Sequence, residues 1–421
     1  MVVAFETVAR CRKLLPPRRR RTLTTSRNIM NRLLLASALT FVLSSCATTM
    51  PTVAARVPCE AQSFTVMDDF VGARRGSCAV LSDDHVRLDI RPEDENVSNP
   101  SAWYAFKLIP HAATEAKISM RYADAYHRYV PKTSHDGLHW TPVDESAVSI
   151  TSDGMDATLN IELGDAPVWV SAQELITPAS YQVWTRTVAN DSDAELSVLG
   201  MSKMDQAINI LTVNADSKEI LFLTGRQHPP EVSGAFAFFS FFETLLADNE
   251  IANRFRDRYQ IIAVPLLNPD GVIGGNWRHN LGNTDLNRDW GPFKQPETRL
   301  IRDLLDRLDS EDKQIRVFLD FHSTAENVFY TQDAENVTNP PAFTNTWLAN
   351  ARPRIPDTYP FTNSENPTTA VGVSKNYMYH RYGIPSSTYE VGDETDREAA
   401  RQAAAIFAQE LMLLMLEQNY E

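Results

Sequence analysis

The chain is poor in cysteine, with four among 421 residues. No CxxC or Cys/His pattern is present, so a cysteine-ligated metal site is not expected. Cys11 and Cys46 lie near the N-terminus, which leaves Cys59 and Cys78 for the body of the chain. These two could form a disulfide in a compartment that permits one.

The N-terminal apolar run is too short to cross a bilayer as a mature helix. Leu33–Leu43 has eleven residues, whereas a spanning helix needs roughly 20. The run follows Asn31-Arg32 and precedes small polar residues, which is the order of a secretion signal. Residues 1–45 are therefore predicted to be a signal region, with Met30 as an alternative start.

A short motif follows the apolar run. Leu43-Ser44-Ser45-Cys46 resembles the lipobox of bacterial lipoproteins, which implies that Cys46 is lipidated and becomes the first mature residue. Residues 46–58 would then be a tether, and Ala47 would favour the outer membrane. We expect a protein of the bacterial cell envelope, held on the membrane through Cys46 and facing the periplasm.

Positive charge is scarce beyond the N-terminus. The net charge is −14, yet residues 1–45 contain nine Lys/Arg and one Glu, so the rest of the chain is still more acidic. An acidic body is a poor candidate for nucleic acid or for direct adsorption to anionic lipid. We expect no nucleic-acid partner.

Residues 59–190 contain several short runs in which apolar residues alternate with polar or small ones. Half-buried antiparallel strands have this pattern, and turn-forming residues separate the runs. These strands are predicted to pack as an antiparallel β-sandwich. We expect the aromatic and basic loop Tyr126–Trp140 to pack structurally. The alternating runs are Val86-Leu88-Ile90, Ala102-Tyr104-Phe106-Leu108, Ile118-Met120-Tyr122 and Leu159-Ile161-Leu163.

Beyond the polar break at residues 189–193, strand patterns alternate with helix patterns. This alternation predicts a second domain over residues 195–421 with an α/β fold, in which helices flank a mixed, mostly parallel sheet. Ligands in such folds bind outside the carboxyl ends of the strands. The expected strands are Ile208–Val213, Ile220–Thr224, Gln260–Leu267, Ile315–Phe321 and Ser386–Val391, and the expected helices are Val232–Ala247, Pro296–Leu308 and Arg397–Gln418.

Three polar residues just past predicted strands could bind a metal. His228 and Glu231 lie three residues apart after the Ile220–Thr224 strand, and His322 directly follows the Ile315–Phe321 strand. Two histidines and one glutamate leave an open coordination position, as in catalytic zinc sites. The alternative is structural, with surface or core histidines and with Glu231 as a first-turn acid.

Two further features fit a substrate with a carboxylate. The loop after the Gln260–Leu267 strand contains Arg278, Asn287 and Arg288, and guanidinium groups match carboxylates in bidentate fashion. Glu390 lies on an apolar strand, where burial tends to raise a carboxyl pKa toward that of a general base.

Taken in order, these motifs resemble the zinc metallocarboxypeptidases of the M14 (funnelin) family. The resemblance covers roughly residues 196–418, and the front domain looks like the β-sandwich of the cytosolic-carboxypeptidase-like branch. It rests on His228-Pro-Pro-Glu231, Arg278, Asp285-Leu-Asn287-Arg288, Pro296-Glu-Thr298, Asp320-Phe-His322-Ser323 and Glu390.

The resemblance implies a zinc site with one ion per chain. His228, Glu231 and His322 would be the ligands, and Asp285 would orient His228 from behind. We expect the zinc-activated water to be the nucleophile of a peptide hydrolysis.

The resemblance also implies the roles around the zinc. Arg278 would polarise the scissile carbonyl and stabilise the oxyanion formed from it. Asn287 and Arg288 would grip the C-terminal carboxylate of the substrate. Glu390 would take a proton from the water and pass it to the leaving amine.

The chain departs from the family pattern before Glu390. Many members carry a tyrosine where this chain has Asn366–Val371, although Tyr377, Tyr379 and Tyr382 are nearby. Lys375 falls at the position that forms the bottom of the specificity pocket in the family. It would favour an acidic C-terminal residue, unless its side chain points to solvent.

The predicted function is a zinc carboxypeptidase that acts on the C-terminus of peptides or proteins, with murein peptides as one substrate class. One alternative is an amidase or deacylase for carboxylate-bearing envelope substrates. Another is a catalytically inactive envelope-binding lipoprotein.

Overall fold

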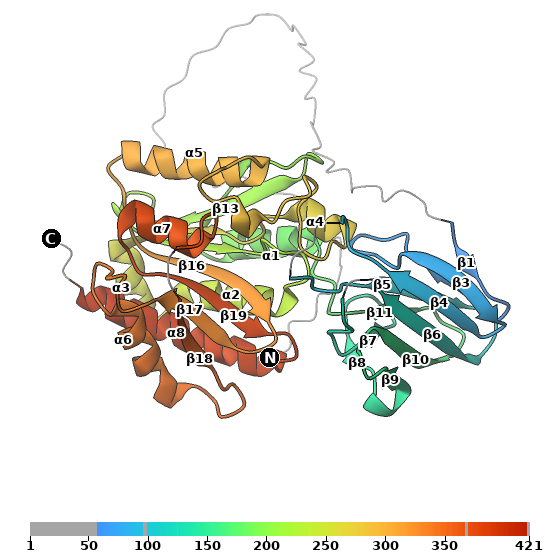
Figure 1. Cartoon of the computed structure of the whole chain (residues 1–421). Helices are drawn as coiled ribbons and strands as arrows, with labels where there is room; N and C mark the ends of the chain where they lie inside the picture. The colour runs from blue at the N-terminus through green and yellow to red at the C-terminus, as the bar shows by residue number, and fades with distance from the viewer. Residues whose placement is uncertain (1–56, 96–98, 124, 367–368, 419–421) are drawn as a thin grey trace, which may run out of the picture. The chain divides into compact units, whose positions relative to one another are not determined.

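The computed structural model describes residues 57–95, 99–123, 125–366 and 369–418. The predicted signal region, its alternative start at Met30, Cys46 and nearly all of the predicted tether lie outside these residues. The described chain belongs to one compact unit, in which a part made of strands, called the first domain below, precedes a part made of strands and helices, called the second domain (Figure 1).

The first domain contains two sheets, as the alternating pattern predicts. The strands that carry the pattern bury every second residue, and Val86, Phe106, Ile118 and Leu159 are fully buried between the sheets. All neighbouring strands in these sheets pair antiparallel except β4 and β6. The sheet orders are β1 (Cys59–Glu60), β2 (Phe64–Met67), β5 (Ala105–Pro110), β11 (Val168–Ser171), β7 (Lys132–Ser134), β8 (Thr141–Pro142), and β3 (Ser77–Ser82), β4 (His85–Ile90), β6 (Thr114–Tyr122), β10 (Asp156–Leu163), β9 (Val148–Ile150).

The two cysteines of this domain form a disulfide. Cys59 on β1 and Cys78 on β3 have Cα atoms 6.1 Å apart and are bonded through their sulfur atoms. Because β1 and β3 belong to different sheets, the disulfide links the two layers of the domain.

The second domain is built on one mixed sheet, in agreement with the predicted fold class. Its central strands β15, β14, β16 and β19 run parallel to one another, and the strands at its edges bring in antiparallel pairs. The five expected strands are all present. The order is β12 (Glu195–Met201), β13 (Ala207–Val213), β15 (Tyr259–Val264), β14 (Glu219–Gly225), β16 (Gln314–Thr324), β19 (Ser386–Gly392), β17 (Val328–Gln332), β18 (Thr362–Asn366).

Helices cover both faces of this sheet. Figure 1 shows α5 and α7 on one side and α6 and α8 on the other, and the buried side chains separate into two clusters accordingly. The helices are α1 (Pro178–Asp191), α2 (Val232–Leu245), α3 (Glu250–Arg258), α4 (Pro269–Gly274), α5 (Pro296–Ser310), α6 (Phe343–Ala351), α7 (Ser374–Tyr382) and α8 (Arg397–Glu417), with short 3₁₀ turns at Glu145–Ala147, Leu286–Arg288 and Arg352–Arg354.

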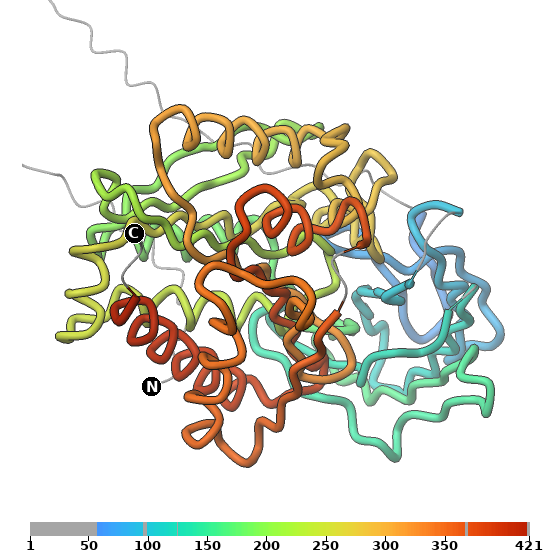
Figure 2. Tube along the Cα trace, turned by 60° about the vertical axis from the view of Figure 1, so that its left-hand side comes forward, coloured from blue at the N-terminus to red at the C-terminus, as the bar shows by residue number. Residues whose placement is uncertain are grey.

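Helix α8 is long and apolar enough to cross a membrane by length and composition alone. Most of its apolar stretch is buried inside the protein, however, and Phe407, Leu411 and Met415 are fully buried in the core. It packs against α2, which lies far from it in the sequence (Figure 2). Its apolar character is therefore explained by the core of the domain.

Helix α1 precedes the predicted domain boundary at residues 190–195. Residues 59–190 are predicted to form strands only, but Pro178–Asp191 form a helix that Thr177 caps at its N-terminus. Trp184 and Val188 of α1 join the core on one face of the eight-stranded sheet. By its packing, α1 therefore goes with the second domain.

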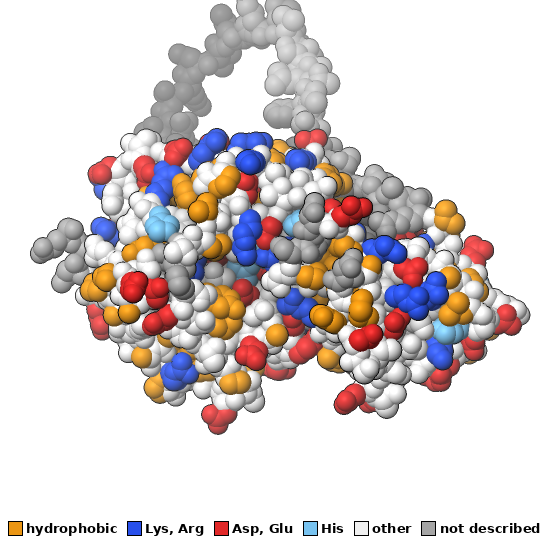
Figure 3. Space-filling model, viewed as in Figure 1, with side chains coloured by type: hydrophobic (Ala, Val, Ile, Leu, Met, Phe, Trp, Pro, Cys, Tyr) orange, Lys and Arg blue, Asp and Glu red, His pale blue; other side chains and the backbone are white. Residues whose placement is uncertain are grey.

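The face of the molecule seen in Figure 3 carries acidic and basic side chains interspersed with scattered apolar ones. Scattered apolar side chains are ordinary on a folded surface. Among the described residues, the face in Figure 3 therefore shows no large apolar patch that would mark a binding site.

Candidate active site

The predicted site residues gather at the carboxyl ends of the central parallel strands. His228 follows the end of β14 at Gly225, and His322 lies near the end of the neighbouring strand β16. Glu390 of β19 is the register partner of His322. Side chains at paired positions of neighbouring strands point to the same face of a sheet. The topology thus brings together residues that are far apart in the sequence.

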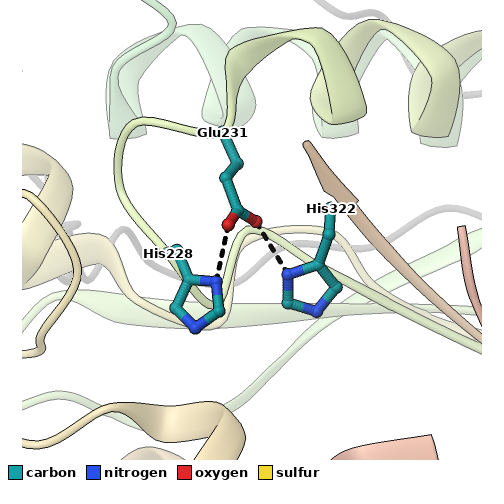
Figure 4. Close-up of side chains that lie close together, drawn as sticks. All are labelled: His228, Glu231 and His322. Carbon is teal, nitrogen blue, oxygen red and sulfur yellow. Dashed lines mark hydrogen bonds and ion pairs between the residues drawn. The ribbon is translucent and has the colours of Figure 1, made fainter. Parts of the chain in front are cut away.

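The two histidines and Glu231 converge on one point (Figure 4). His228 Nδ1 lies 2.7 Å from Glu231 Oε1, and His322 Nδ1 lies 2.7 Å from Glu231 Oε2. One ligand atom from each residue falls within 4.8 Å of the other two. Glu231 is the N-cap residue of α2, so the helix start fixes its position. All three side chains are buried.

Each histidine is held from behind by a carboxylate. His228 Nε2 lies 2.9 Å from Asp285 Oδ1, and His322 Nε2 lies 2.8 Å from Asp320 Oδ2. Such partners fix the tautomer and orientation of a metal-binding imidazole and raise its basicity. The predicted neighbour of His228 is therefore where the resemblance implies. Asp320 is a second residue of this kind.

The charges of the site favour a cation between the ligand atoms. Burial opposes ionisation of Glu231, yet His228 and His322 outweigh it and lower the pKa of Glu231. Burial also opposes a charged His322, but Asp320 and Glu231 raise the pKa of His322 well above its ordinary value. A divalent cation held by the three side chains would supply positive charge beside the Glu231 carboxylate. The donor set of two imidazoles and one carboxylate suits zinc.

Glu390 lies beside the candidate ligands with one oxygen lacking a partner. Its Oε2 is buried without a hydrogen bond to any described group. Burial, opposed by His322 and helped by the charge of Glu231, raises the pKa of Glu390 to about 7. A buried carboxyl with an unused oxygen and a pKa near neutrality is suited to proton transfer. β19 lies between β16 and β17, so Glu390 is on an internal strand of the sheet.

Arg278 reaches the same cavity from the loop after α4. Its Nε donates to Asp285 Oδ2 at 2.6 Å, and the side chain is buried. Asp285 therefore joins His228 and Arg278 through its two oxygens. Burial opposes the ionised form of Asp285, but His228 and Arg278 outweigh it and lower its pKa.

Asn287 and Arg288 follow on the same loop. The Asn287 side chain is buried, accepts the backbone N–H of Ser374 at 2.8 Å, and points its Nδ2 toward His322. The Arg288 side chain is exposed, and its Nη1 donates to the Asn287 carbonyl at 2.7 Å. Both residues line the cavity, as the resemblance implies.

The cavity has a volume of about 300 Å³ and includes Lys375 in its wall. Lys375 lies in the first turn of α7, is buried, and donates from Nζ to the Thr331 carbonyl at 3.1 Å. It therefore does not point to solvent. Burial, opposed by the charge of Asp333, lowers the pKa of Lys375 to about 8.

The tyrosines near the expected family position take other roles. Tyr377 packs against Trp290, and the hydroxyl groups of Tyr379 and Tyr382 donate to Val337 O and Asp309. None of the three lines the cavity. Among the described residues that do, the tyrosine is Tyr330 on β17. Tyr330 was not among the residues predicted for the site.

Two other residues at the site have roles that were not predicted from the sequence. Asp320 lies two positions before His322 on β16, so the period-two rule for strands could have paired them. Arg128 comes from the Tyr126–Trp140 loop, which was expected only to pack. Its Nε donates to Asp393 Oδ2 at 2.8 Å, and the residue lines the cavity. No local signal marks Arg128, because its partners are distant in sequence.

The two prolines between the first two ligands have a structural explanation. Pro229 and Pro230 are buried, and neither has a backbone N–H that would need a partner there. The carbonyl of Pro229 accepts two bonds from the Arg226 side chain, at 2.9 and 2.7 Å. The turn that connects His228 to Glu231 is therefore rigid and has few groups to satisfy.

Gly234 allows α2 to lie directly against the strand that carries His322. A Cβ atom at this position would lie 2.4 Å from the His322 carbonyl oxygen. We expect Gly234→Ala to displace either Glu231 or His322 and to lower zinc affinity at least about tenfold. Zinc titration with a competing chelator measures this change. The control is Gly164→Ala, whose added Cβ would meet nothing within 4 Å; equal affinities in the two variants would contradict the prediction.

Fold and site together define a zinc-hydrolase type of protein: a mixed α/β sheet with a His/Glu/His set at the ends of its central strands. The family model of the zinc carboxypeptidases, Peptidase M14, matches residues 180–412. This is more than half of the chain, and the chain belongs to that family. The predicted family is thereby confirmed.

The chain is similar in sequence to cytosolic carboxypeptidases. Cytosolic carboxypeptidase 2 of Danio rerio is 33% identical over 170 residues, which are 36% of this chain and 23% of that protein. Cytosolic carboxypeptidase 6 of Mus musculus is 31% identical over 144 residues, which are 31% of this chain and 27% of that protein. The chain thus spans about a quarter of the length of these relatives.

Solved structures share the fold. A metallo-carboxypeptidase from Burkholderia cenocepacia superposes with a TM-score of 0.71 at 18% identity, covering 84% of this chain and 99% of that one. One from Pseudomonas aeruginosa gives 0.67 at 20% identity, with coverages of 84% and 99%. Since 84% exceeds the share of the second domain, the likeness extends into the β-sandwich.

Proposed function

We propose that the protein is a zinc carboxypeptidase that hydrolyses the C-terminal peptide bond of peptides or proteins. One observation carries this proposal. The converging His228, Glu231 and His322 share a single cavity with an unpartnered carboxylate oxygen of Glu390 and with the Asn287-Arg288 pair. Such a cavity has a place for a metal, a base and a substrate carboxylate.

In this proposal His228, Glu231 and His322 hold the ion, which acts as a Lewis acid and makes water a strong nucleophile near neutral pH. Asn287 and Arg288 bind the C-terminal carboxylate and place the last peptide bond in the cavity. Arg278, aligned by Asp285, donates to the carbonyl oxygen as negative charge develops on it. Glu390 accepts the proton of the attacking water and delivers it to the leaving amine.

We propose further that the enzyme prefers an acidic C-terminal residue. Lys375 is buried in the wall of the cavity, where its ammonium group can pair with a carboxylate. A charge-assisted hydrogen bond to a buried group contributes about 1.5–3 kcal/mol. That corresponds to a factor of about 10 to 100 in affinity.

Lys375→Met should therefore lower kcat/KM about 10- to 100-fold for a peptide ending in Glu and much less for one ending in Gln. The pKa of Lys375 is about 8. The side chain is charged below that pH and neutral above it, so the preference for Glu over Gln should decline as the pH rises from 7 to 9. The parent protein should show the decline and the variant should not.

The control is Lys294→Met, which removes an exposed lysine. A preference for basic or aromatic C-terminal residues in a uniform peptide panel would refute the acidic pocket.

We also propose that the enzyme is a lipid-anchored protein of the bacterial envelope, held through Cys46 and facing the periplasm. The signal-like residues 1–45 and the lipobox-like motif support this location. The Cys59–Cys78 disulfide fits an oxidising compartment. Peptides with a free carboxylate, including murein peptides, are the substrates to try first. Mass spectrometry of the membrane-extracted protein would reveal a lipidated N-terminal Cys46, and an unmodified earlier N-terminus would refute the anchor.

The proposed activity is tested with the purified protein. Bound zinc is measured by elemental analysis, and C-terminal residues released from the peptide panel are identified by mass spectrometry. One zinc per chain with sequential release from C-termini is the expected result. Zinc without turnover would favour an inactive binding protein, and cleavage of acylated amino acids alone would favour a deacylase.

A further inference from the structure

A carboxylate of the β-sandwich domain binds the backbone of the loop that carries Arg278. Glu93 Oε2 accepts the N–H of Trp277 at 2.7 Å, and Oε1 accepts the N–H of Arg278 at 3.0 Å and also that of His279. The Glu93 side chain is 5% exposed. Three consecutive amides that point at one carboxylate form an anion-binding concavity.

The same loop is also inserted into the β-sandwich. Trp277 is fully buried among the core residues of that domain, and its Nε1 donates to the Trp103 carbonyl at 2.9 Å. A Cβ at Gly275 would lie 2.7 Å from the Gly72 carbonyl oxygen, so the two backbones touch. The residues on both sides of Arg278 are therefore fixed by the first domain.

We propose that Glu93 is a positioning residue for Arg278, through which the β-sandwich domain forms part of the catalytic apparatus. Glu93 fixes the backbone of Arg278, while Asp285 fixes its guanidinium. With both ends held, the guanidinium stays aimed into the cavity before substrate arrives. This inference rests on the proposed function, in which Arg278 stabilises the developing oxyanion.

A cation bound by Glu93, Asp94 and His279 is the competing explanation, because their ligand atoms lie close together. The existing bonds argue against it. Both Glu93 oxygens already accept backbone N–H groups, and His279 Nδ1 pairs with Asp94 at 2.6 Å. The cluster is satisfied by its own hydrogen bonds.

Removing the acceptor would leave three N–H groups without their partner, and the loop would rearrange to reach water. A displacement of about 1 Å in a catalytic group can reduce turnover about 100-fold. Among the described residues, Glu93 has no hydrogen bond to the candidate ligands or to the Asn287-Arg288 pair, so zinc content and KM should be nearly unchanged.

The test compares Glu93→Ala, Glu93→Gln and the control Glu95→Ala in the zinc-loaded full chain. Glu95 is an exposed carboxylate two residues away. We expect kcat to fall about 100-fold for Glu93→Ala and less for Glu93→Gln, which keeps one acceptor oxygen. Glu95→Ala should match the parent. A Glu93→Ala variant with normal kcat, or one that loses a second zinc ion per chain, would overturn the inference.

A double-mutant cycle separates positioning from general destabilisation. In an Arg278→Ala background, Glu93→Ala should reduce kcat less than about twofold further, since the group it positions is already gone. A full additional loss would show that Glu93 acts elsewhere and would overturn the inference. If Arg278→Ala alone keeps normal kcat, the role of Arg278 in the proposed function fails. If Arg278→Ala lowers kcat but Glu93→Ala does not, the positioning role of Glu93 fails and the proposed function stands.

Discussion

Glu390→Gln should reduce kcat about 10³-fold or more while zinc content and folding stay intact. The amide is nearly isosteric with the carboxyl but cannot accept the proton of the attacking water, and general base catalysis is worth about 10²–10⁴-fold. Pre-steady-state and steady-state peptide hydrolysis, with zinc analysis of the same sample, measures the effect. Unchanged turnover would remove Glu390 from the mechanism.

The pH profile of the parent protein should report the same group. Burial raises the pKa of Glu390 to about 7, and a bound divalent cation would stabilise the carboxylate and lower that value. Because the base works only when ionised, kcat/KM should fall as the pH drops through this pKa, with a midpoint below 7. The residual kcat/KM of Glu390→Gln should not show this decrease at low pH.

His322→Ala should abolish zinc binding and reduce activity to that of the chelator-treated parent, at least about 10³-fold. The substitution removes one of three ligands and leaves Asp320 buried without its imidazole partner. Elemental analysis and hydrolysis of a peptide ending in Glu test this result together.

The matched control is His135→Ala, which removes an exposed histidine of the β-sandwich. It should keep one zinc per chain and parental activity. If His322→Ala also kept its zinc and turnover, the His/Glu/His assignment would be wrong.

The elements of the second domain were largely predictable because each carries a local signal. The central strands are continuous apolar runs, as buried parallel strands must be, and β14 matches its predicted range to within one residue at either end. The amphipathic pattern likewise located α5. Helix α1 was missed because it follows a run of strands and its apolar face is covered by distant residues.

The candidate site residues were predictable from the sequence, but most of the residues that hold them in place by hydrogen bonds were not. His228, Glu231, His322 and Glu390 are marked by their positions after or on apolar strands. The hydrogen bond between Asp320 and His322 could have been inferred from strand periodicity. Arg128 and Glu93 could not, because their partners lie 265 and 184–186 residues away and meet them only after the domains pack.

The sequence by itself determined the order of the motifs, the strands they follow, and therefore the family and the candidate ligand set. The tertiary structure alone decided which groups hold those residues in place. It placed Asp320 behind His322, Arg226 on the Pro229 carbonyl, and Glu93 on the Arg278 loop. The physical reason is that strand and helix patterns depend on neighbours in the chain, whereas buried hydrogen bonds are satisfied by whatever the folded chain brings within about 3 Å.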